Sequence, residues 1–411
     1  MLAFERVEDI IMWGIGKRDF VLFLLASAAL GMTQSIDTSF FNNFLNDNYH
    51  LTITQRTLLE IPREFPGFAV VFVTGLLFAF GDLRTAAVAN LLGGLGALGL
   101  AFWSPEYLPM IGWLTVYSMG QHLFMPMSNS IGMNLASDGH IGRRLGQING
   151  VNTAVFLVTS LITAFLFRII NIDYHLAFSF SAGAFFLSAV LILCMTPHSG
   201  KRTGKRFILR QEYKVFYGLN ILYGARKQIF ITFGPWVLIK VFEQGVATFA
   251  VLSFLIAGIG IVFKPFIGHL IDSVGERFIL AGEAITLIFI CLGYAFTEGL
   301  LFTMGLGTMT LYVICALFIL DQVLASVSMA RATYLRKIAL SADDVSPTLS
   351  MGMTMDHMVS MFVPWLGGFV WTVLGYQYVF ICGAVIATLN LLLTTKMEPF
   401  TKLPDHTEAV V

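Results

Sequence analysis

Long apolar segments follow one another along almost the whole chain, and short polar or basic connections separate them. About 20 apolar residues in an α-helix are long enough to cross the roughly 30 Å hydrocarbon core of a bilayer. The alternation of polar and apolar residues that is typical of transmembrane β-strands is absent from these segments. The pattern therefore predicts twelve membrane-spanning helices. They cover residues 20–44, 56–80, 85–103, 108–134, 146–167, 175–196, 213–242, 246–271, 278–297, 302–334, 347–373 and 376–396.

The composition agrees with this pattern. Of the 411 residues, 56% are hydrophobic and only 12% are charged, too few to cover a water-soluble protein of this size with polar surface. The formal net charge is zero, so the chain as a whole has no bias toward nucleic acid. We predict an all-α membrane protein.

Motifs of enzymes and of metal sites are missing. The sequence contains no G-x-S-x-G, H-E-x-x-H or P-loop motif, so we expect no enzyme activity. Its four cysteines occur singly inside apolar segments, which favours packing over disulfides or metal binding. We expect no cofactor and no metal from these spacings.

Basic residues are distributed unevenly among the connections, and short basic loops resist translocation across a membrane. The connections and span ends on one predicted side hold most of them, among them Arg84, Arg143, Arg144, Lys201, Arg277, Arg331, Arg336 and Lys337. The opposite side keeps only Arg56, Arg168 and Lys240. We therefore expect both termini in the cytoplasm. Short loops without large soluble domains suggest a multi-pass protein of the cytoplasmic (inner) membrane.

The chain divides near its middle. Residues 197–210 form the only basic, Gly-containing linker of their length, with six predicted spans on each side. A shift of 193 residues superimposes Gly31 on Gly224 and Arg84 on Arg277, and shifts of 201 or 202 align further pairs. This internal repeat predicts two pseudo-symmetric six-helix bundles. The bundles cover residues 1–196 and 213–411, and a cytoplasmic linker covers 197–212.

A loop motif follows the eighth predicted span. It reads G-H-L-I-D-S-V-G-E-R and contains Gly268, Asp272, Gly275 and Arg277. This motif resembles the G-x-x-x-D-x-x-G-x-R loop signature of the major facilitator superfamily of transporters. The first-half copy keeps Gly75 and Arg84, but Ala79 stands where the acid belongs, and Asp82 lies one turn further on.

The resemblance implies a twelve-helix transporter whose spans 1, 4, 7 and 10 line a central cavity. It also implies that the acid and the arginine of the loop make charge contacts between helices that favour one facing of the transporter, here Asp272 and Arg277. The alternative for this loop is a tight polar turn. No subfamily or solute follows from the resemblance.

Polar side chains occur at similar depths in several predicted spans. A charge near the bilayer centre costs at least about 2.5 kcal/mol, so such groups face protein or water. They are Gln121 and His122 in span 4, Arg226 and Lys227 in span 7, Asp321 and Gln322 in span 10, and Asp356 and His357 in span 11. Span 1 adds Asp37. We expect these groups to meet near the middle of the membrane.

Two adjacent cations, Arg226 and Lys227, offer a forked donor and a point charge to an anionic group. The alternative is that they form structural ion pairs with Asp321 or Asp356. Candidate substrate-binding residues are Arg226, Lys227, Gln121, His122 and Gln322. Candidate proton-coupling residues are Asp321, Asp356, Asp37 and Glu64.

In span 2, Glu60 and Glu64 share a helix face with Arg63, so two acids are expected to compete for one arginine. This cluster could be a gate or a proton relay, or a satisfied polar network near the membrane interface. His122 and His357 could relay protons or serve as hydrogen-bonded packing residues. Glu283 is expected near the cytoplasmic end of span 9, with a reach to headgroups or to the loop.

The sequence therefore favours a secondary transporter that moves a small anionic or amphoteric solute by alternating access, coupled to protons or working by exchange. One rival is proton-driven efflux of hydrophobic or cationic compounds, which would use the acids. A second rival is a non-transporting sensor or scaffold on a transporter fold. The expected partners are the solute, protons and membrane lipids, without nucleic acid, and we expect a monomer.

Overall fold

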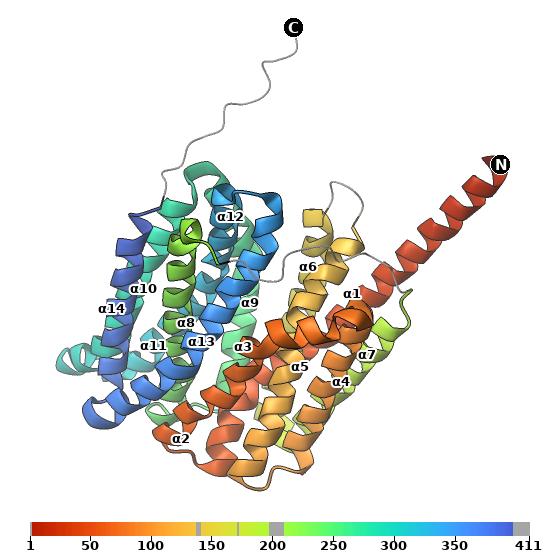
Figure 1. Cartoon of the computed structure of the whole chain (residues 1–411). Coiled ribbons are helices and arrows are strands. Elements are labelled where there is room, and N and C mark those ends of the chain that lie inside the picture. Colours follow the sequence, from red (N-terminus) through yellow and green to blue (C-terminus); the bar gives the residue numbers. More distant parts are fainter. Residues whose placement is uncertain (1, 137–140, 171, 197–208, 398–411) are drawn as a thin grey trace.

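The computed structural model describes residues 2–136, 141–170, 172–196 and 209–397, and these residues form helices and short connections without a strand (Figure 1). The first half of the chain contains seven α-helices. They are α1 (Leu2–Tyr49), α2 (Ile53–Leu58), α3 (Glu60–Leu76), α4 (Gly81–Phe102), α5 (Tyr107–Asn134), α6 (Ile141–Phe165) and α7 (Tyr174–Leu193). Two short helical turns, η1 (Leu77–Phe80) and η2 (Leu166–Ile170), extend α3 and α6.

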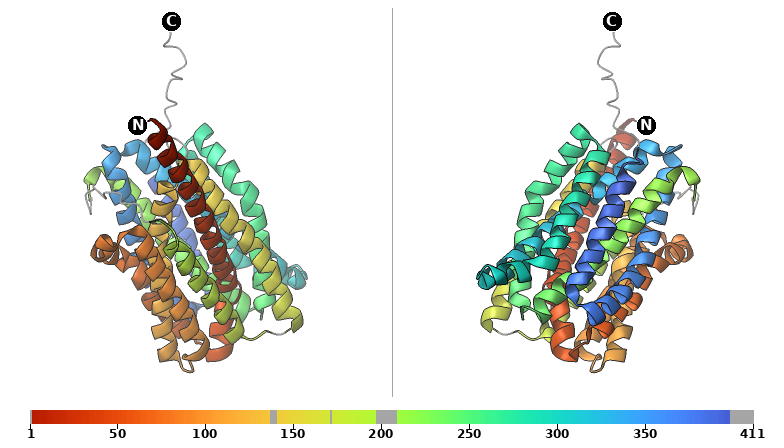
Figure 2. Two further views of the ribbon diagram at one scale, coloured as in Figure 1. Left: turned by 90° about the vertical axis from the view of Figure 1, so that its right-hand side faces the viewer. Right: turned by 90° about the vertical axis from the view of Figure 1, so that its left-hand side faces the viewer.

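The second half also contains seven α-helices. They are α8 (Lys214–Lys240), α9 (Val246–Val274), α10 (Glu276–Thr303), α11 (Thr310–Leu324), α12 (Met329–Ile338), α13 (Ala342–Leu374) and α14 (Tyr376–Thr394). Three short helical turns lie between these helices. η3 (Gln211–Tyr213) precedes α8, η4 (Gly307–Met309) precedes α11, and η5 (Ala325–Ser328) joins α11 to α12. In both views of Figure 2 the long helices run side by side at a shared inclination.

The prediction of twelve spans is confirmed when α2 and α3 are counted as one span and α11 and α12 as another. By length and composition, nine segments of the described chain are apolar enough to cross a membrane. The remaining three spans are α2 with α3, α5, and α8. Helix α3 has only 17 residues because the span is broken at Leu59, whereas α5 and α8 contain polar residues such as His122 and Arg226 that lower their hydropathy.

One predicted boundary is wrong. Span 10 was expected to begin at residue 302, but residues 302 and 303 still belong to α10, and the chain turns before η4. Gly305 occupies this turn with a φ of 70°, a conformation that favours glycine. The apolar residues around the turn, including Phe302 and Leu306, hid it from a reading based on hydropathy.

The helices pack in two groups. In the first half α4 packs on α5 and α7, and α1 packs on α6 and α7; in the second half α10 packs on α14, and α8 packs on α13 and α14. A Cβ on Gly120 of α5 would clash with the backbone nitrogen of Gly93 in α4, so these two helices touch through glycine. Most of the expected linker at 197–212 lies outside the described residues.

The two groups meet along α3 with α13, α6 with α9, and α1 with α9. The first residues of α1 and the last residues of α14 lie at one end of the molecule, and α2 lies at the opposite end (Figure 1). Close contacts between the halves occur at the α2 end. Asn43 Nδ2 donates to the carbonyl oxygen of Gln244 at 2.9 Å, and a Cβ on Gly368 would clash with Thr57 Oγ1. The halves are thus in contact far from the chain ends.

Candidate functional site

A buried charge network lies inside the second half. Arg226 of α8 is 3.0 Å from Asp321 of α11 and 4.0 Å from Glu283 of α10. Arg331 of α12 is 3.6 Å from the other oxygen of Glu283, and its guanidinium lies over the Tyr223 ring. All four charged groups are buried, and the two arginines balance the two acids. Arg226 and Asp321 therefore form an ion pair within one half.

The positions of Glu283 and Arg331 in this network differ from those expected from the sequence. Glu283 was expected to reach headgroups or the loop near the end of its span, but it is buried against the two arginines. Helix α10 begins at Glu276, so Glu283 lies two turns inside it. Arg331 was expected on the cytoplasmic side, at the end of span 10 (302–334), but it is buried on α12 against Glu283.

A second ion pair also lies within the second half but is less buried. Lys227 Nζ is 2.8 Å from Asp356 Oδ1 of α13, and the side chains are 17% and 13% exposed. The corresponding values for Arg226 and Asp321 are 5% and 3%. Ser360 Oγ, one turn along α13, donates to the same Asp356 oxygen at 3.2 Å. Ser360 thus holds the Asp356 carboxylate in place, while part of the Lys227–Asp356 pair remains exposed.

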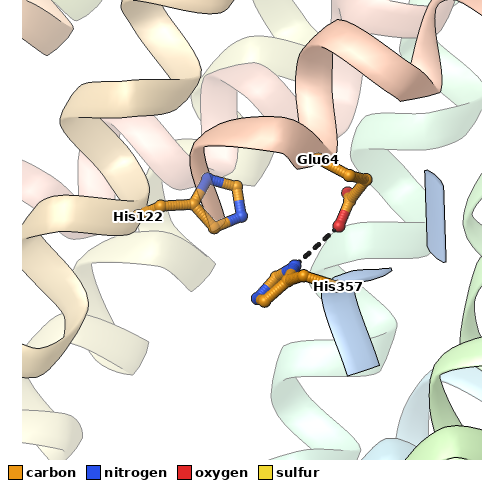
Figure 3. A group of neighbouring side chains, drawn as sticks. All are labelled: Glu64, His122 and His357. Carbon is orange, nitrogen blue, oxygen red and sulfur yellow. Dashed lines mark hydrogen bonds and ion pairs between the residues drawn. The ribbon is translucent and has the colours of Figure 1, made fainter. Parts of the chain in front are cut away.

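Three polar groups lie between the halves (Figure 3). His357 Nδ1 of α13 is 2.8 Å from Glu64 Oε2 of α3. The His122 ring of α5 lies edge to face with the His357 ring, with 4.8 Å between the centroids. A Cβ on Gly67 would lie 2.7 Å from an atom of each histidine ring. Only glycine at this position lets both rings reach α3.

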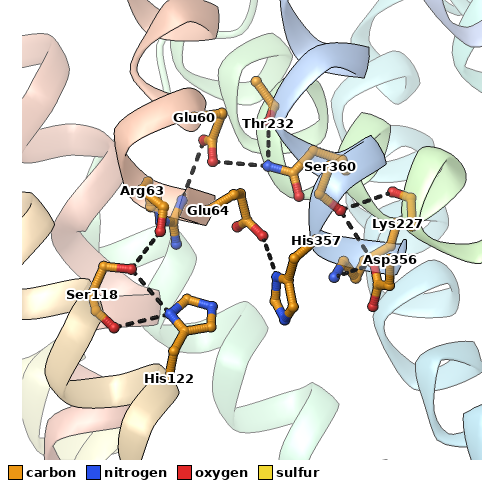
Figure 4. Close-up of polar contacts among 12 residues, drawn as sticks. Glu60, Arg63, Glu64, Ser118, His122, Lys227, Thr232, Asp356, His357 and Ser360 are labelled. Atoms are coloured by element: carbon orange, nitrogen blue, oxygen red, sulfur yellow. Dashed lines mark hydrogen bonds and ion pairs between the residues drawn. The ribbon is translucent and has the colours of Figure 1, made fainter. Parts of the chain in front are cut away.

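Next to this group, Glu60 is held by partners from both halves (Figure 4). Arg56 and Arg63 pair with one of its oxygens, and Gln228 Nε2 of α8 donates to the other at 2.8 Å. Arg56 is completely buried and lies against the Trp236 ring. The expected competition of Glu60 and Glu64 for one arginine does not occur, since Glu60 pairs with two arginines and Glu64 with His357.

Asp37 of α1 differs from the other acids of the candidate site in its contacts. Arg63 of α3 and Tyr117 and Gln121 of α5 face it within electrostatic range. The residue is partly exposed, and the described part of the chain gives it no ion pair within 4.0 Å. By contrast, Asp321, Asp356 and Glu64 each have a cation or a histidine within 3.0 Å.

The other polar residues predicted for the site, Gln322 and His122, form hydrogen bonds beside these charged groups. Gln322 Nε2 donates to Asp321 Oδ2 at 3.0 Å, beside the pair with Arg226. His122 Nδ1 is 2.9 Å from the carbonyl oxygen of Ser118 and 3.0 Å from its hydroxyl. The structure thus brings the polar residues of spans 4, 7, 10 and 11 into neighbouring groups, although Arg226 and Glu64 belong to different ones.

Residues 21–341 match the family model described as Major Facilitator Superfamily. The chain belongs to the major facilitator superfamily. It is therefore a multi-pass membrane transporter, and members of this superfamily are generally not enzymes. No curated protein sequence matches the chain.

Solved structures of other superfamily members share the fold. A D-xylose-proton symporter is 14% identical with a TM-score of 0.71, and the match covers 94% of this chain and 98% of that one. A point mutant of the nucleoside transporter NupG is 13% identical with a TM-score of 0.71 over 93% and 99% of the two chains. A bacterial homolog of the human lysosomal transporter Spinster, inward-facing and unoccupied, is 12% identical with a TM-score of 0.67 over 95% and 99%.

The loop that resembles the superfamily signature connects α9 to α10. Gly275 separates α9 from α10 with a φ of 88°, which explains a glycine at the second glycine position of the motif. Gly268 lies in the last turns of α9, where a Cβ would meet no neighbour within 4 Å. Asp272 is exposed and has no ion pair in the described chain, and Arg277 has none either. The ion pair described at this loop joins Glu276 to Lys337 of α12 at 2.7 Å.

In the first-half copy of the signature, Asp82 accepts a hydrogen bond from Ser130 of α5. Arg84 is exposed at the start of α4, and Gly75 belongs to the last turn of α3. The two superfamily loops therefore differ in their polar contacts. Asp82 connects α4 to α5, whereas the contact in the second half comes from the residue after Gly275.

Proposed function

We propose that this chain is a secondary transporter of a small amphoteric solute, working by alternating access and coupled to exchange or to protons. Membership of the superfamily supports secondary transport in general. The pair of Lys227 and Asp356 is the observation that carries the finer proposal, because it offers both signs of charge within 2.8 Å on a partly exposed surface.

An amphoteric solute matches this pair. A carboxylate of the solute replaces Asp356 as the partner of Lys227, and a cationic group of the solute takes the carboxylate of Asp356. The exchange leaves no charge unpaired, so it avoids the several kcal/mol that a lone charge would cost in a dry site. An anion alone would leave Asp356 without a partner, and a cation alone would leave Lys227 without one.

Arg226 is a weaker candidate than its neighbour for direct solute binding. Its guanidinium already has Asp321 at 3.0 Å and Glu283 at 4.0 Å, all within one half. Adjacent residues on a helix also diverge by about 100°, so Arg226 and Lys227 face different surroundings. This arrangement favours the structural alternative for Arg226, with Gln121, His122 and Gln322 as polar neighbours of the solute.

For proton coupling we propose Asp37 first among the candidate acids. Protonation of Asp37 breaks no ion pair in the described chain, whereas protonation of Asp321 or Asp356 would release a buried cation. The groups that face Asp37 are Arg63, Tyr117 and Gln121. A carboxyl group that gains and loses a proton there changes its attraction to Arg63, which lies beside the contacts between the halves.

A neutral polar solute is the second candidate. Each buried cation of the second half already has an acid beside it, so the described site carries no excess charge. The similar structures described as a D-xylose symporter and a nucleoside transporter concern solutes of this kind. Gln121 and Gln322 would then supply the hydrogen bonds.

The test is solute binding and flux with purified protein. Thermal unfolding in detergent at pH 6 and pH 8 is recorded with zwitterions, anions, cations, sugars and nucleosides, since a ligand stabilises the state that it binds. Flux of any stabilising compound is then measured in liposomes. The variants are Lys227→Gln and Asp356→Asn, and Lys240→Gln is the matched control, because Lys240 is an exposed lysine on the same helix.

Stabilisation by zwitterions that both variants lose and the control keeps supports the amphoteric solute. Stabilisation by sugars or nucleosides in the native chain, retained in both variants, supports the neutral solute instead. Stabilisation by hydrophobic cations alone contradicts both candidates and favours efflux. Failure of the folded, purified chain to move any stabilising compound favours the sensor or scaffold.

A further inference from the structure

We propose that Glu64, His122 and His357 form a transition-metal site of the Zn²⁺ class that bridges the two halves. Each of the three residues offers one ligand atom, and these atoms lie within 4.8 Å of one another. Two imidazoles and a carboxylate are a ligand set that Zn²⁺ uses when it keeps a fourth position open. The spacing along the sequence predicted no metal, because the ligands belong to three separate helices.

The His122 ring is oriented for metal binding by its own helix. Its Nδ1 is 2.9 Å from the carbonyl oxygen of Ser118, which can only accept a hydrogen bond. Nδ1 therefore carries the hydrogen, and Nε2 keeps its lone pair. In Figure 3 this second ring nitrogen is turned toward Glu64 and His357. A histidine whose other nitrogen donates to a carbonyl group is the common arrangement around a bound metal.

The three ligands need only a small movement. Ligand atoms about 2.0–2.1 Å from a tetrahedral ion are about 3.3 Å apart. The present distances reach 4.8 Å at most, and Glu64 and His357 are already 2.8 Å apart. A bound ion replaces this one hydrogen bond by a bond to each partner, and the hydrogen on His357 Nδ1 moves to Nε2 or is released to solvent. Gly67 keeps the space between the rings open, since a Cβ there would lie 2.7 Å from both.

The charges around the site are compatible with a divalent cation. Glu64 supplies one negative charge, and Lys227, a cation within its electrostatic range, is paired with Asp356 at 2.8 Å. The other acid of α3, Glu60, is bound to Arg56 and Arg63 and does not compete as a ligand. The ion would therefore partly neutralise the site without meeting an unpaired cation.

The position of the site gives the ion a conformational effect. Glu64 and His122 belong to the first half and His357 to the second, so all three ligands are available only when these surfaces are together. A ligand favours the state that it binds better. The ion would hold the halves in contact and slow the separation that alternating access requires. This inference needs no knowledge of the transported solute.

The test is titration of the purified full chain with Zn²⁺ alone, by calorimetry, and with Co²⁺, whose visible absorption reports four-coordination. We expect one ion per chain. Glu64→Gln, His122→Gln and His357→Gln should each weaken Zn²⁺ binding at least about tenfold. His269→Gln is the matched control, because His269 is an exposed histidine on α9, and it should leave the affinity unchanged.

Two further measurements keep the proposal falsifiable if a ligand variant unfolds. Gly67→Ala retains all three ligands but crowds both rings, and it should weaken Zn²⁺ binding too. Hydrogen exchange should show that Zn²⁺ protects α3 and α13 together in the native chain. The proposal is overturned if Zn²⁺ binds equally to all variants, if it does not bind, or if it protects only one half.

Discussion

The ion pair of Arg226 and Asp321 allows a quantitative test of what a buried charge does in this fold. At 3.0 Å, with an effective dielectric constant of about 20, the two charges attract each other by about 5 kcal/mol. Removal of both groups from water costs several kcal/mol for each one, which offsets most of that attraction. The pair as a whole should therefore add little to stability, although each partner depends strongly on the other.

The perturbations follow from this balance. Arg226→Met leaves Asp321 buried without its cation, and Asp321→Leu leaves Arg226 with Glu283 at 4.0 Å as its remaining acid. Each single change should lower the free energy of unfolding by about 3–5 kcal/mol. The double variant keeps the balance, because Arg331 still faces Glu283 at 3.6 Å. Its stability should lie within about 1 kcal/mol of the native chain.

The assay is reversible unfolding in mixed micelles with increasing denaturing detergent, followed by tryptophan fluorescence, for the native chain, both singles and the double. The coupling energy from this cycle, which is the effect of the double change minus the sum of the two single effects, should be at least about 5 kcal/mol in magnitude. Lys240→Met is the control, because it removes an exposed cation from the same helix, and it should change stability by less than about 0.5 kcal/mol. Flux in liposomes is measured for the same variants.

Two results would refute the reasoning. If Arg226→Met alone is as stable as the native chain, the ion pair does not hold a buried charge in place. If the double variant is less stable than either single, the two charges act separately and the balance described here is wrong. If the double variant is stable but no longer moves any solute, Arg226 or Asp321 takes part in solute binding after all.

Three further predictions follow from particular contacts. Asp37→Asn should remove the pH dependence of flux while leaving solute exchange intact, as measured in liposomes with and without a proton gradient; a flux that still follows pH would contradict it. Gly120→Val should sharply lower the yield of folded protein in size-exclusion chromatography, whereas Gly183→Ala, where a Cβ meets nothing within 4 Å, should be tolerated. Gly368→Leu would push Thr57 away, so alkylation of a cysteine at the buried position Leu59 should become faster. An unchanged rate would count against a closed contact there.

The sequence predicts most of the fold because the bilayer allows few solutions. Every backbone polar group in hydrocarbon must be paired, so a long apolar segment in this chain can only be a helix. The turn at Gly305 was misplaced because the residues around it are apolar as well. The break between α2 and α3 does have a signal in the sequence, since Pro62 in the first turn of α3 has no backbone N–H to donate to the carbonyl group of Leu58.

The candidate site was predictable as a set of residues but not as a set of contacts. The cost of a buried charge identifies Arg226, Lys227, Asp321 and Asp356 from hydropathy alone. It cannot decide which acid pairs with which cation, because that depends on how each helix is rotated. Arg56 shows the same limit, since it was expected at an exposed end but is buried beside Trp236. The capping box of Thr52 and Gln55 starts α2 and positions this arginine one residue later.

The contacts within one half and those between the halves have different consequences for alternating access. Pairs such as Arg226 with Asp321 move together with their half and stay intact when the halves rock. Contacts such as Glu64 with His357 and Glu60 with Gln228 must break when the same surfaces separate. A solute, a proton or a metal ion changes the equilibrium only through groups whose contacts differ between the states. The residues at the interface of α3 with α8 and α13 therefore meet this condition. Lys227 also meets it, because Glu64 of the first half lies within its electrostatic range, whereas the more deeply buried pair of Arg226 and Asp321 does not.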